Sequence, residues 1–207
     1  MGTLILASKS LRRRELLVHL GIPFKSKPSN LDEESFAATD PKTLVKRLAL
    51  EKSLALAQRY PKNAILGADT VVFCRGKILG KPKNKNEALT MLRSLHGQKH
   101  RVMTGVAIIV PGKKMIEVVE TVVTMRRYSE KEMRSYVQSG KALDKAGAYA
   151  IQDKDFNPVK KYAGCGCNVV GLPLWTVAQM LKKMGLNPKI SKKTLPAMCG
   201  QCPFATR

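Results

Sequence analysis

The chain has 207 residues, of which 44% are hydrophobic and 25% charged; this is ordinary for a globular protein and enough for one well-cored domain. No apolar run is long enough to span a bilayer, and no basic segment precedes the first apolar run, so we expect a cytoplasmic protein without membrane contact. The formal net charge of +22 would attract nucleic acid, but Lys and Arg are spread along the whole chain and aromatic residues are few, which favours a solvated basic surface over a nucleic-acid partner.

The first elements read as a strand followed by a helix. Residues 3–7 form a short apolar run, and serines then offer N-cap chemistry before a helix over residues 11–20. At the start of that helix, free backbone N–H groups, the Ser8 hydroxyl and the guanidinium groups of Arg12 and Arg13 suit a phosphate. Taken by itself, the pattern is explained more simply by an ordinary N-cap with solvated arginines.

Two further candidate residues lie in a loop and on a helix. Glu33 belongs to the polar stretch 30–34, and Asp40 followed by proline predicts the start of a helix that continues to about residue 59. Lys52 lies on a face of that helix that is otherwise apolar or small. A solvated loop acid and a lysine whose stem packs on apolar surface are the simplest interpretations of these two residues.

The segment 67–82, GADTVVFCRGKILGKP, is the most informative part of the chain. We expect Asp69 at the end of a strand, beside Thr70, and Lys81 in a turn after a hairpin. A carboxylate and a lysine at one sheet edge suit phosphate chemistry, because the acid can hold a metal or activate water and the amine can neutralise phosphate oxygens. The segment is not a P-loop, since three residues separate Gly76 from Gly80 and a proline follows the lysine.

Helices and strands alternate in the rest of the chain. We expect helices over 84–95, 129–139 and 172–184, strands over 99–110 and 114–125, and short extended segments over 148–151 and 158–162. Hairpins interleaved with helices predict an α/β fold with a mixed sheet and two connected lobes. Gln152 follows the extended segment 148–151, where its amide either reads the edge of a base or lies in a surface loop.

Four of the five cysteines form two closely spaced pairs. These are Cys165-x-Cys167 and, in the tail, Cys199-x-x-Cys202, whereas Cys74 lies in an apolar strand. Two such pairs can close a tetrahedral zinc site, although C-x-C is not the usual spacing. The spacing leaves open a redox site or four free thiols.

A series of motifs occurs in order along the chain: SKSLRRREL, KRLALEKSLALA, GADTVV, ILGKP, EALTMLRSLHGQKHRVMTGVA, YVQSGKALDKAGAYAIQ and NVVGLPL. Together they resemble the Maf family of nucleotide pyrophosphatases, from about Leu4 to Leu186. The resemblance implies an elongated mixed sheet with flanking helices, a cleft between two lobes, and a homodimer. It also implies cleavage of a nucleoside triphosphate between its α and β phosphates, with Mg²⁺ or Mn²⁺, to a monophosphate and pyrophosphate.

The resemblance also implies roles for single residues. The proton acceptor of the family falls on Asp69, which together with Glu33 would hold the metal ion. The positions that bind phosphate fall on Ser8, Arg13, Lys52 and Lys81. The positions that separate subfamilies fall on Arg12, Thr70 and Gln152. Arg, Thr and Gln form the pattern of the branch that acts on dTTP and UTP, whereas the 7-methyl-GTP branch usually has a bulky residue at the first position and Glu at the third.

The sequence departs from the family pattern in three places. Leu11 replaces a common proline, the loop 153–157 is charged where the family tends to be small and Gly-rich, and the segment 164–167 carries cysteines in place of Tyr and Ser. We expect a single Maf-like catalytic domain over residues 1–186 and a tail with Lys and Cys residues over 187–207.

The expected activity is hydrolysis of dTTP, UTP or modified pyrimidine triphosphates. Two alternatives remain: a 7-methyl-GTP pyrophosphatase of the same fold, and a basic nucleic-acid-binding or regulatory protein with vestigial catalysis.

Overall fold

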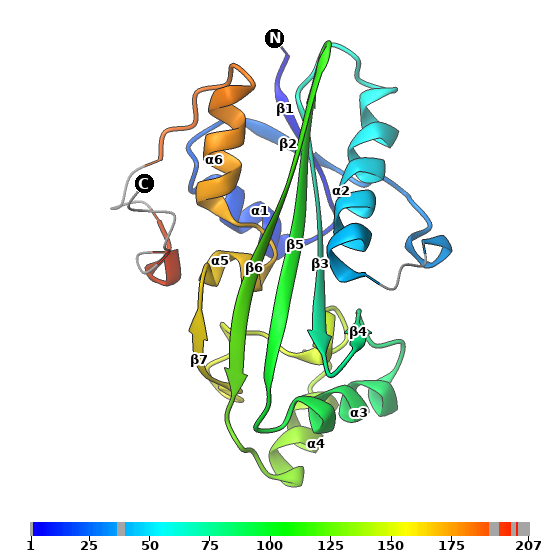
Figure 1. The fold of residues 1–207 in the computed structure, drawn as a ribbon, viewed down its shortest axis with the longest axis vertical. Coiled ribbons are helices and arrows are strands. Elements are labelled where there is room, and N and C mark those ends of the chain that lie inside the picture. Colours follow the sequence, from blue (N-terminus) through cyan, green and yellow to red (C-terminus); the bar gives the residue numbers. More distant parts are fainter. Residues whose placement is uncertain (1, 37–39, 191–194, 200–201, 203–207) are drawn as a thin grey trace.

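A computed structural model describes residues 2–36, 40–190, 195–199 and 202 (Figure 1). The strands are β1 (Leu4–Ala7), β2 (Phe24–Lys27), β3 (Ile65–Cys74), β4 (Lys77–Leu79), β5 (Lys99–Val110), β6 (Lys113–Met125) and β7 (Val159–Ala163). The α-helices are α1 (Leu11–Val18), α2 (Pro41–Ala57), α3 (Lys85–Leu95), α4 (Glu130–Gln138), α5 (Gly166–Val170) and α6 (Leu174–Lys183). Short 3-10 turns are η1 (Glu33–Ser35), η2 (Ala146–Ala148) and η3 (Ala197–Cys199).

The strands form one mixed sheet in the order β2-β1-β3-β5-β6-β7, with β4 paired to β3. β1 runs parallel to β2 and β3, whereas β3, β5, β6 and β7 pair antiparallel. The predicted mixed α/β sheet with flanking helices is therefore confirmed. In Figure 1 the long strands β3, β5 and β6 run through the length of the molecule, with α2 and α6 beside one half and α3 and α4 beside the other.

Strand alternation distributes the apolar side chains to both faces of the sheet. In β1, Leu4 and Leu6 pack with α1 and α6, whereas Ile5 packs with Leu56 of α2. Because successive strand residues point to opposite faces, four apolar residues in a row are what a strand covered on both sides requires.

A second hydrophobic core fills the other half of the molecule. It joins the far ends of β3, β5 and β6 to α3 and α4, through residues such as Val72, Leu92, Met125 and Tyr136. The two cores lie along the same long strands and are separate clusters of buried side chains. The molecule thus has two lobes that share one sheet.

The predicted helix starts carry side-chain caps. The side chains of Ser10, Asp40 and Asn84 each accept a backbone N–H from the first turn of α1, α2 and α3. Ser129 and Glu132 form a complete capping box at the start of α4. Such caps satisfy backbone donors that have no partner inside the helix, which is why these short polar residues could be recognised in the sequence.

Two sequence-based expectations are wrong in detail. The segment 148–151 is extended only in part: Tyr149 has extended angles (φ -140°, ψ 162°), but Gly147 and Ala148 adopt φ angles of 69° and 61° within η2, and a turn begins at Ile151. Asp69 does not end a strand, since β3 continues to Cys74 as one element. The apolar residues after Asp69 keep that strand buried into the second lobe. Along the described parts of the chain, the helices are too short or too polar to cross a bilayer.

Candidate active site

The site forms where one edge of β3 has no neighbouring strand. β1 pairs with residues 65–67 of β3, and β4 pairs with residues 72–74 on that side of the sheet, whereas β5 covers the other edge throughout. Residues 68–71 therefore face the gap between β1 and β4. Asp69 and Thr70 lie in this gap on opposite faces of the strand, so groups from both faces of the sheet can reach it.

Two glycines allow α2 to lie directly on the sheet above the gap. A Cβ atom at Gly67 would be 2.4 Å from the carbonyl oxygen of Ala49, and one at Gly105 would be 2.2 Å from that of Val45. Only a residue without a side chain fits such a close backbone approach. The close contact brings Lys52, about one turn further along α2, over the carboxylate of Asp69.

Lys52 joins two carboxylates in this gap. Its buried ammonium lies 2.6 Å from Asp69 Oδ1 and 2.9 Å from Glu33 Oε1. Partial burial acts to raise the pKa of Glu33, but Lys52, Lys81 and Arg13 together lower it below its usual value. Lys52 is 4% exposed and Asp69 6% exposed, so burial holds their contact in place, whereas the Glu33 side chain is 47% exposed. The simplest interpretations from the sequence, a solvated acid at Glu33 and a lysine packed on apolar surface at Lys52, are therefore replaced by one ion-pair network that joins both residues to Asp69.

Arg13 is fixed on the opposite face of β3. Its Nε donates to the carbonyl oxygen of Gly171 at 2.9 Å, and Nη2 donates to Thr70 Oγ1 at 3.1 Å. Nη1 also reaches the hydroxyl of Ser8 at 3.5 Å. Thr70 in turn shares a 2.9 Å hydrogen bond with Thr104 of β5. Desolvation lowers the pKa of Arg13, and the nearby carboxylates of Asp69 and Glu33 act in the opposite direction. The hydrogen bonds hold the guanidinium in a defined orientation.

Asp144 and Lys145 belong to the site, although sequence reasoning assigned them no role. Arg12 Nη1 lies 2.5 Å from Asp144 Oδ2, and Arg12 Nη2 donates to the Asp144 carbonyl at 2.9 Å. Lys145 Nζ is 2.5 Å from the other carboxylate oxygen of Asp144. The quoted motif KALDKAGAYAIQ contains both residues, but their contact with a helix 132 positions earlier depends on the tertiary fold.

All nine residues expected in the site line one cavity of about 890 Å³, which is a suitable size for a nucleotide. They are Ser8, Arg12, Arg13, Glu33, Lys52, Asp69, Thr70, Lys81 and Gln152. Lys81 lies just after β4, in a loop whose Gly80 carbonyl accepts the Gly147 N–H at 2.9 Å. The geometry brings the residues together, and their individual chemical roles remain predictions.

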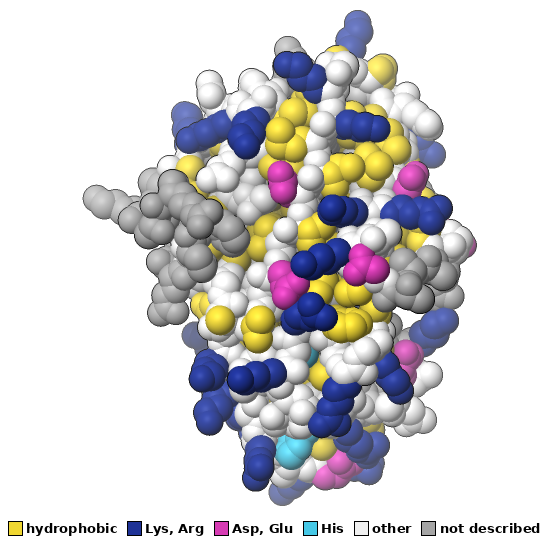
Figure 2. Space-filling view, in the orientation of Figure 1, with side chains coloured by type: hydrophobic (Ala, Val, Ile, Leu, Met, Phe, Trp, Pro, Cys, Tyr) yellow, Lys and Arg dark blue, Asp and Glu magenta, His cyan; other side chains and the backbone are white. Residues whose placement is uncertain are grey.

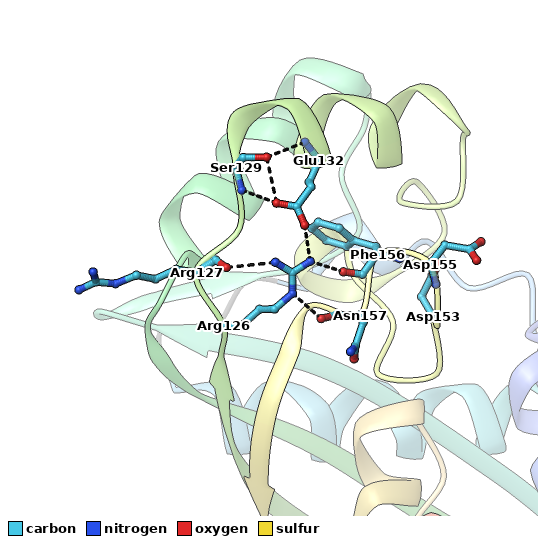
Figure 3. A network of polar contacts seen from close by, with 8 residues as sticks. All are labelled: Arg126, Arg127, Ser129, Glu132, Asp153, Asp155, Phe156 and Asn157. Atoms are coloured by element: carbon cyan, nitrogen blue, oxygen red, sulfur yellow. Dashed lines mark hydrogen bonds and ion pairs between the residues drawn. The ribbon is translucent and has the colours of Figure 1, made fainter.

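The loop that follows Gln152 is held by Arg126 (Figure 3). Arg126 Nη2 donates to the carbonyl oxygen of Phe156 at 2.6 Å, and Nε donates to that of Asn157 at 2.7 Å. The same guanidinium is 2.6 Å from Glu132, the capping residue of α4. Hydrogen bonds from the Ser129 backbone and from Arg126 lower the pKa of Glu132 to about 2. The charged loop is therefore tied to the second lobe.

Asp69 and Glu33 fit the divalent cation that the resemblance implies. Their carboxylate oxygens converge on one cation, the ammonium of Lys52. Mg²⁺ is commonly bound by one or two carboxylates together with substrate phosphates, so two acids are enough for a metal that arrives with a triphosphate. Within the described residues, no set of three or more His, Cys, Asp and Glu side chains forms a metal site.

The four paired cysteines also come together, but not as four free ligands. Cys167 and Cys199 form a disulfide, whereas Cys165 and Cys202 are free and buried. None of the four lines the cavity that contains Asp69. Two free thiols are too few to complete the predicted zinc site, so that site remains a prediction for the reduced chain.

The fold and the site define a mixed α/β protein whose cleft combines three carboxylates with several cations, an arrangement suited to a phosphorylated ligand. Residues 3–184 match the family described as "Maf-like protein". The chain therefore belongs to this family.

Several relatives are similar over most of the chain. A dTTP/UTP pyrophosphatase of Thermomicrobium roseum is 43% identical over 205 residues, which cover 98% of this chain and 94% of that protein. A dTTP/UTP pyrophosphatase of Symbiobacterium thermophilum is 44% identical over 185 residues, or 89% of this chain and 95% of that protein. One of Dehalococcoides mccartyi is 39% identical over 206 residues, or 97% of this chain and 91% of that protein.

Proposed function

We propose that the protein hydrolyses dTTP and UTP to the monophosphate and pyrophosphate. The observation that carries this proposal is the meeting of Asp69, Lys52 and Arg13 at the open edge of β3, inside a cavity of nucleotide size. The similarity to relatives named dTTP/UTP pyrophosphatases supports the choice of substrate. Modified pyrimidine triphosphates fall within the same proposal.

Asp69 acts on the attacking water in this mechanism. In the free protein its carboxylate contacts the Lys52 ammonium, which is drawn toward the phosphate oxygens when a triphosphate enters. The freed carboxylate oxygen then orients a water and accepts its proton as the water attacks the α-phosphorus. A divalent ion bound with the substrate would supply charge neutralisation on the phosphate oxygens.

The cations stabilise the departing pyrophosphate. Arg13 is already held by Gly171 and Thr70, so its orientation is set before the substrate binds. Lys81 approaches the cleft from the loop after β4, and Lys52 approaches from α2. Fixed positive charges placed where negative charge develops lower the barrier without further reorganisation. No covalent intermediate is needed.

Gln152, which lines the same cavity, selects the base. Gln152 carries an amide that both donates and accepts, as the N3 and O4 edge of thymine or uracil requires. Arg12 lines the same cavity and is held by Asp144. A 7-methyl-GTP specificity is the alternative, and the absence of an acidic side chain at position 152 argues against it.

The resemblance to the family also supports proposals on cofactor, assembly and compartment. We propose a requirement for Mg²⁺ or Mn²⁺, a homodimer, and a cytoplasmic location. We further propose that nucleic acid is not a partner, which a binding measurement discussed below tests.

A substrate panel compares the wild type with Asp69→Asn in Mg²⁺ or Mn²⁺. It contains dTTP, UTP, CTP, GTP and 7-methyl-GTP, and both monophosphate and pyrophosphate are quantified. We expect selective turnover of dTTP and UTP, and a kcat about 10²–10⁴-fold lower in Asp69→Asn, since a positioned general base contributes that much. Turnover of 7-methyl-GTP alone would contradict the role of Gln152, and turnover of no triphosphate would contradict the proposal as a whole.

A further inference from the structure

Four cysteine side chains converge beside the first core, away from the cleft. Cys165 and Cys167 lie at the start of α5, and Cys199 and Cys202 lie in and just after η3. All four are at most 2% exposed and belong to one hydrophobic cluster. Two segments, whose Cys167 and Cys199 are separated by 32 residues in the sequence, thus bring their cysteines into one cluster of buried side chains.

The sulfur atoms of each segment face those of the other. Cys167 and Cys199 form a disulfide with a Cα–Cα distance of 6.0 Å. The free thiols of Cys165 and Cys202 share a hydrogen bond. The four sulfurs therefore form two contacting pairs, each with one member from either segment, and all four side chains belong to the same hydrophobic cluster.

The backbone around Cys165 is held rigidly. Its N–H donates to Thr121 Oγ1 at 3.1 Å, and the Thr121 hydroxyl donates back to the Cys165 carbonyl at 3.0 Å. The backbone N–H groups of Cys167 and Asn168 also approach the Cys165 sulfur as hydrogen-bond donors. These backbone contacts fix the position of the Cys165 sulfur, as outer contacts commonly do for the ligands of a metal site.

The tail is packed closely onto this segment. A Cβ atom at Gly166 would be 2.9 Å from the carbonyl oxygen of Met198, so the glycine between the first two cysteines allows the approach. Tyr162 Oη donates to the same carbonyl at 3.3 Å. In the tail, the Cys202 N–H donates to the Cys199 carbonyl at 3.0 Å, a tight turn that keeps the two cysteines of C-x-x-C close together.

We propose that, in the reduced chain, Cys165, Cys167, Cys199 and Cys202 bind one Zn²⁺ ion as four thiolates. Reduction by a dithiol transfers two electrons and two protons to the Cys167–Cys199 disulfide, and the dithiol itself becomes a disulfide. Four thiols then bind zinc and release four protons. Four protein sulfurs complete the tetrahedral coordination of zinc and leave no open position for water, which defines a structural site and not a catalytic one.

The role of the zinc ion is to fix the tail onto the core. The tail has little other regular structure among its described residues, in which η3 is a single short turn. A disulfide would fix it too, but disulfides are rare in reducing compartments, where zinc serves the same purpose. The zinc site also explains why the chain has the two free buried thiols of Cys165 and Cys202 in addition to the disulfide, because zinc needs all four sulfurs.

The full chain is purified with a dithiol reductant and without chelator, and its metal content is measured by elemental analysis and native mass spectrometry. We expect one zinc ion per chain in the wild type and its loss in Cys202→Ser and Cys165→Ser. Cys74→Ser is the matched control, since Cys74 is a buried cysteine of β3 in the other core, and it keeps the zinc.

Two results would overturn the zinc site. One is a wild type whose five cysteines all react with a thiol reagent after denaturation, yet which retains no zinc after exposure to ZnCl₂ and desalting. The other is loss of zinc from Cys74→Ser to the same extent as from Cys202→Ser. Where a serine variant does not fold, Co²⁺ added to the reduced wild type gives the same answer: tetrahedral cobalt–thiolate absorption bands support the site, and their absence overturns it. Neither readout depends on nucleotide turnover.

Discussion

Single glycines determine whether Lys52 reaches Asp69. We expect Gly105→Ala to destabilise the protein by about 1–3 kcal/mol or more, because the new methyl group would overlap the Val45 carbonyl of α2. Moving α2 outward also lengthens the 2.6 Å contact of Lys52 with Asp69, so activity falls as well. Urea unfolding measures the first effect and steady-state kinetics the second.

Gly80→Ala is the matched control for stability. A Cβ atom at Gly80 would have no neighbour within 4 Å, and its φ is not in the left-handed region. We expect its free energy of unfolding to differ from the wild type by less than about 0.5 kcal/mol, as for ordinary surface changes. Equal losses in Gly105→Ala and Gly80→Ala would show that the close packing of α2 is unimportant.

His100 is a buried group whose protonation opposes folding. Its Nε2 shares a 2.7 Å hydrogen bond with the Tyr149 hydroxyl, and no described residue accepts a hydrogen bond from its Nδ1. Desolvation lowers its pKa from 6.5 to about 4. The unfolded chain therefore binds a proton below pH 6.5 that the folded chain does not bind until about pH 4, so stability decreases as the pH falls through this window.

The His100→Gln variant isolates this contribution. A shift of this size corresponds to about 3 kcal/mol between pH 7 and pH 4, and the variant should lack that part of the pH dependence. Urea midpoints at several pH values across this range give the difference between the two proteins. Parallel loss of stability in both proteins would mean that other groups account for the whole effect.

At the scale of elements, Arg126 connects α4 to the loop after Gln152 (Figure 3). Replacement by lysine keeps the charge but removes the planar fork that binds two carbonyls and Glu132 at once. We expect Arg126→Lys to raise the KM for dTTP several-fold while kcat changes little, because Asp69 and Lys52 lie on other elements. Selectivity between dTTP and GTP should also fall.

Arg127→Lys serves as the control, since its side chain points away from the network in Figure 3. We expect wild-type KM and selectivity in that variant. A fall in kcat with unchanged KM in Arg126→Lys would contradict a role in positioning the base-binding loop, and would indicate a more general loss of the fold.

Elements were predictable from the sequence where the cause is local. The caps at Ser10, Asp40 and Ser129 follow from side-chain chemistry within one helical turn, and the long β5–β6 hairpin follows from alternation. The turn at Gly147 and Ala148 was missed, because left-handed φ angles at an alanine depend on contacts made elsewhere.

The candidate site was found through ordered motifs, but its geometry was not. No local sequence pattern predicts that β1 and β4 leave residues 68–71 of β3 unpaired on that edge, because the gap depends on the register of three strands. The same holds for the contact of Arg12 with Asp144, which joins residues 132 positions apart. The chemistry of the side chains could thus be inferred, whereas the arrangement that places Asp69 in mid-strand could not.

At the scale of the whole molecule, the net charge of +22 comes from Lys and Arg residues that are spread along the whole sequence. On the face shown in Figure 2, Lys and Arg side chains occur from one end to the other, with acidic and apolar groups between them. Charges of this kind attract any polyanion through the solvent, where salt screens them. Cations inside the cleft are different, since Arg13 and Lys52 are held by hydrogen bonds and partly or fully buried.

The salt dependence of binding therefore distinguishes the proposed enzyme from the alternative, a nucleic-acid-binding protein. Between about 50 mM and about 200 mM salt, binding to a DNA duplex should fall by several orders of magnitude, as expected for non-specific phosphate contacts. Over the same range we expect the KM for dTTP to rise only a few-fold, because the cleft contacts are less screened. Fluorescence anisotropy with labelled duplex and steady-state kinetics in matched buffers give the two curves. Two results together would favour the nucleic-acid-binding protein: tight DNA binding that persists at the higher salt, and a KM for dTTP that rises as steeply as non-specific DNA binding falls. The cleft would then be only one part of a diffuse basic surface.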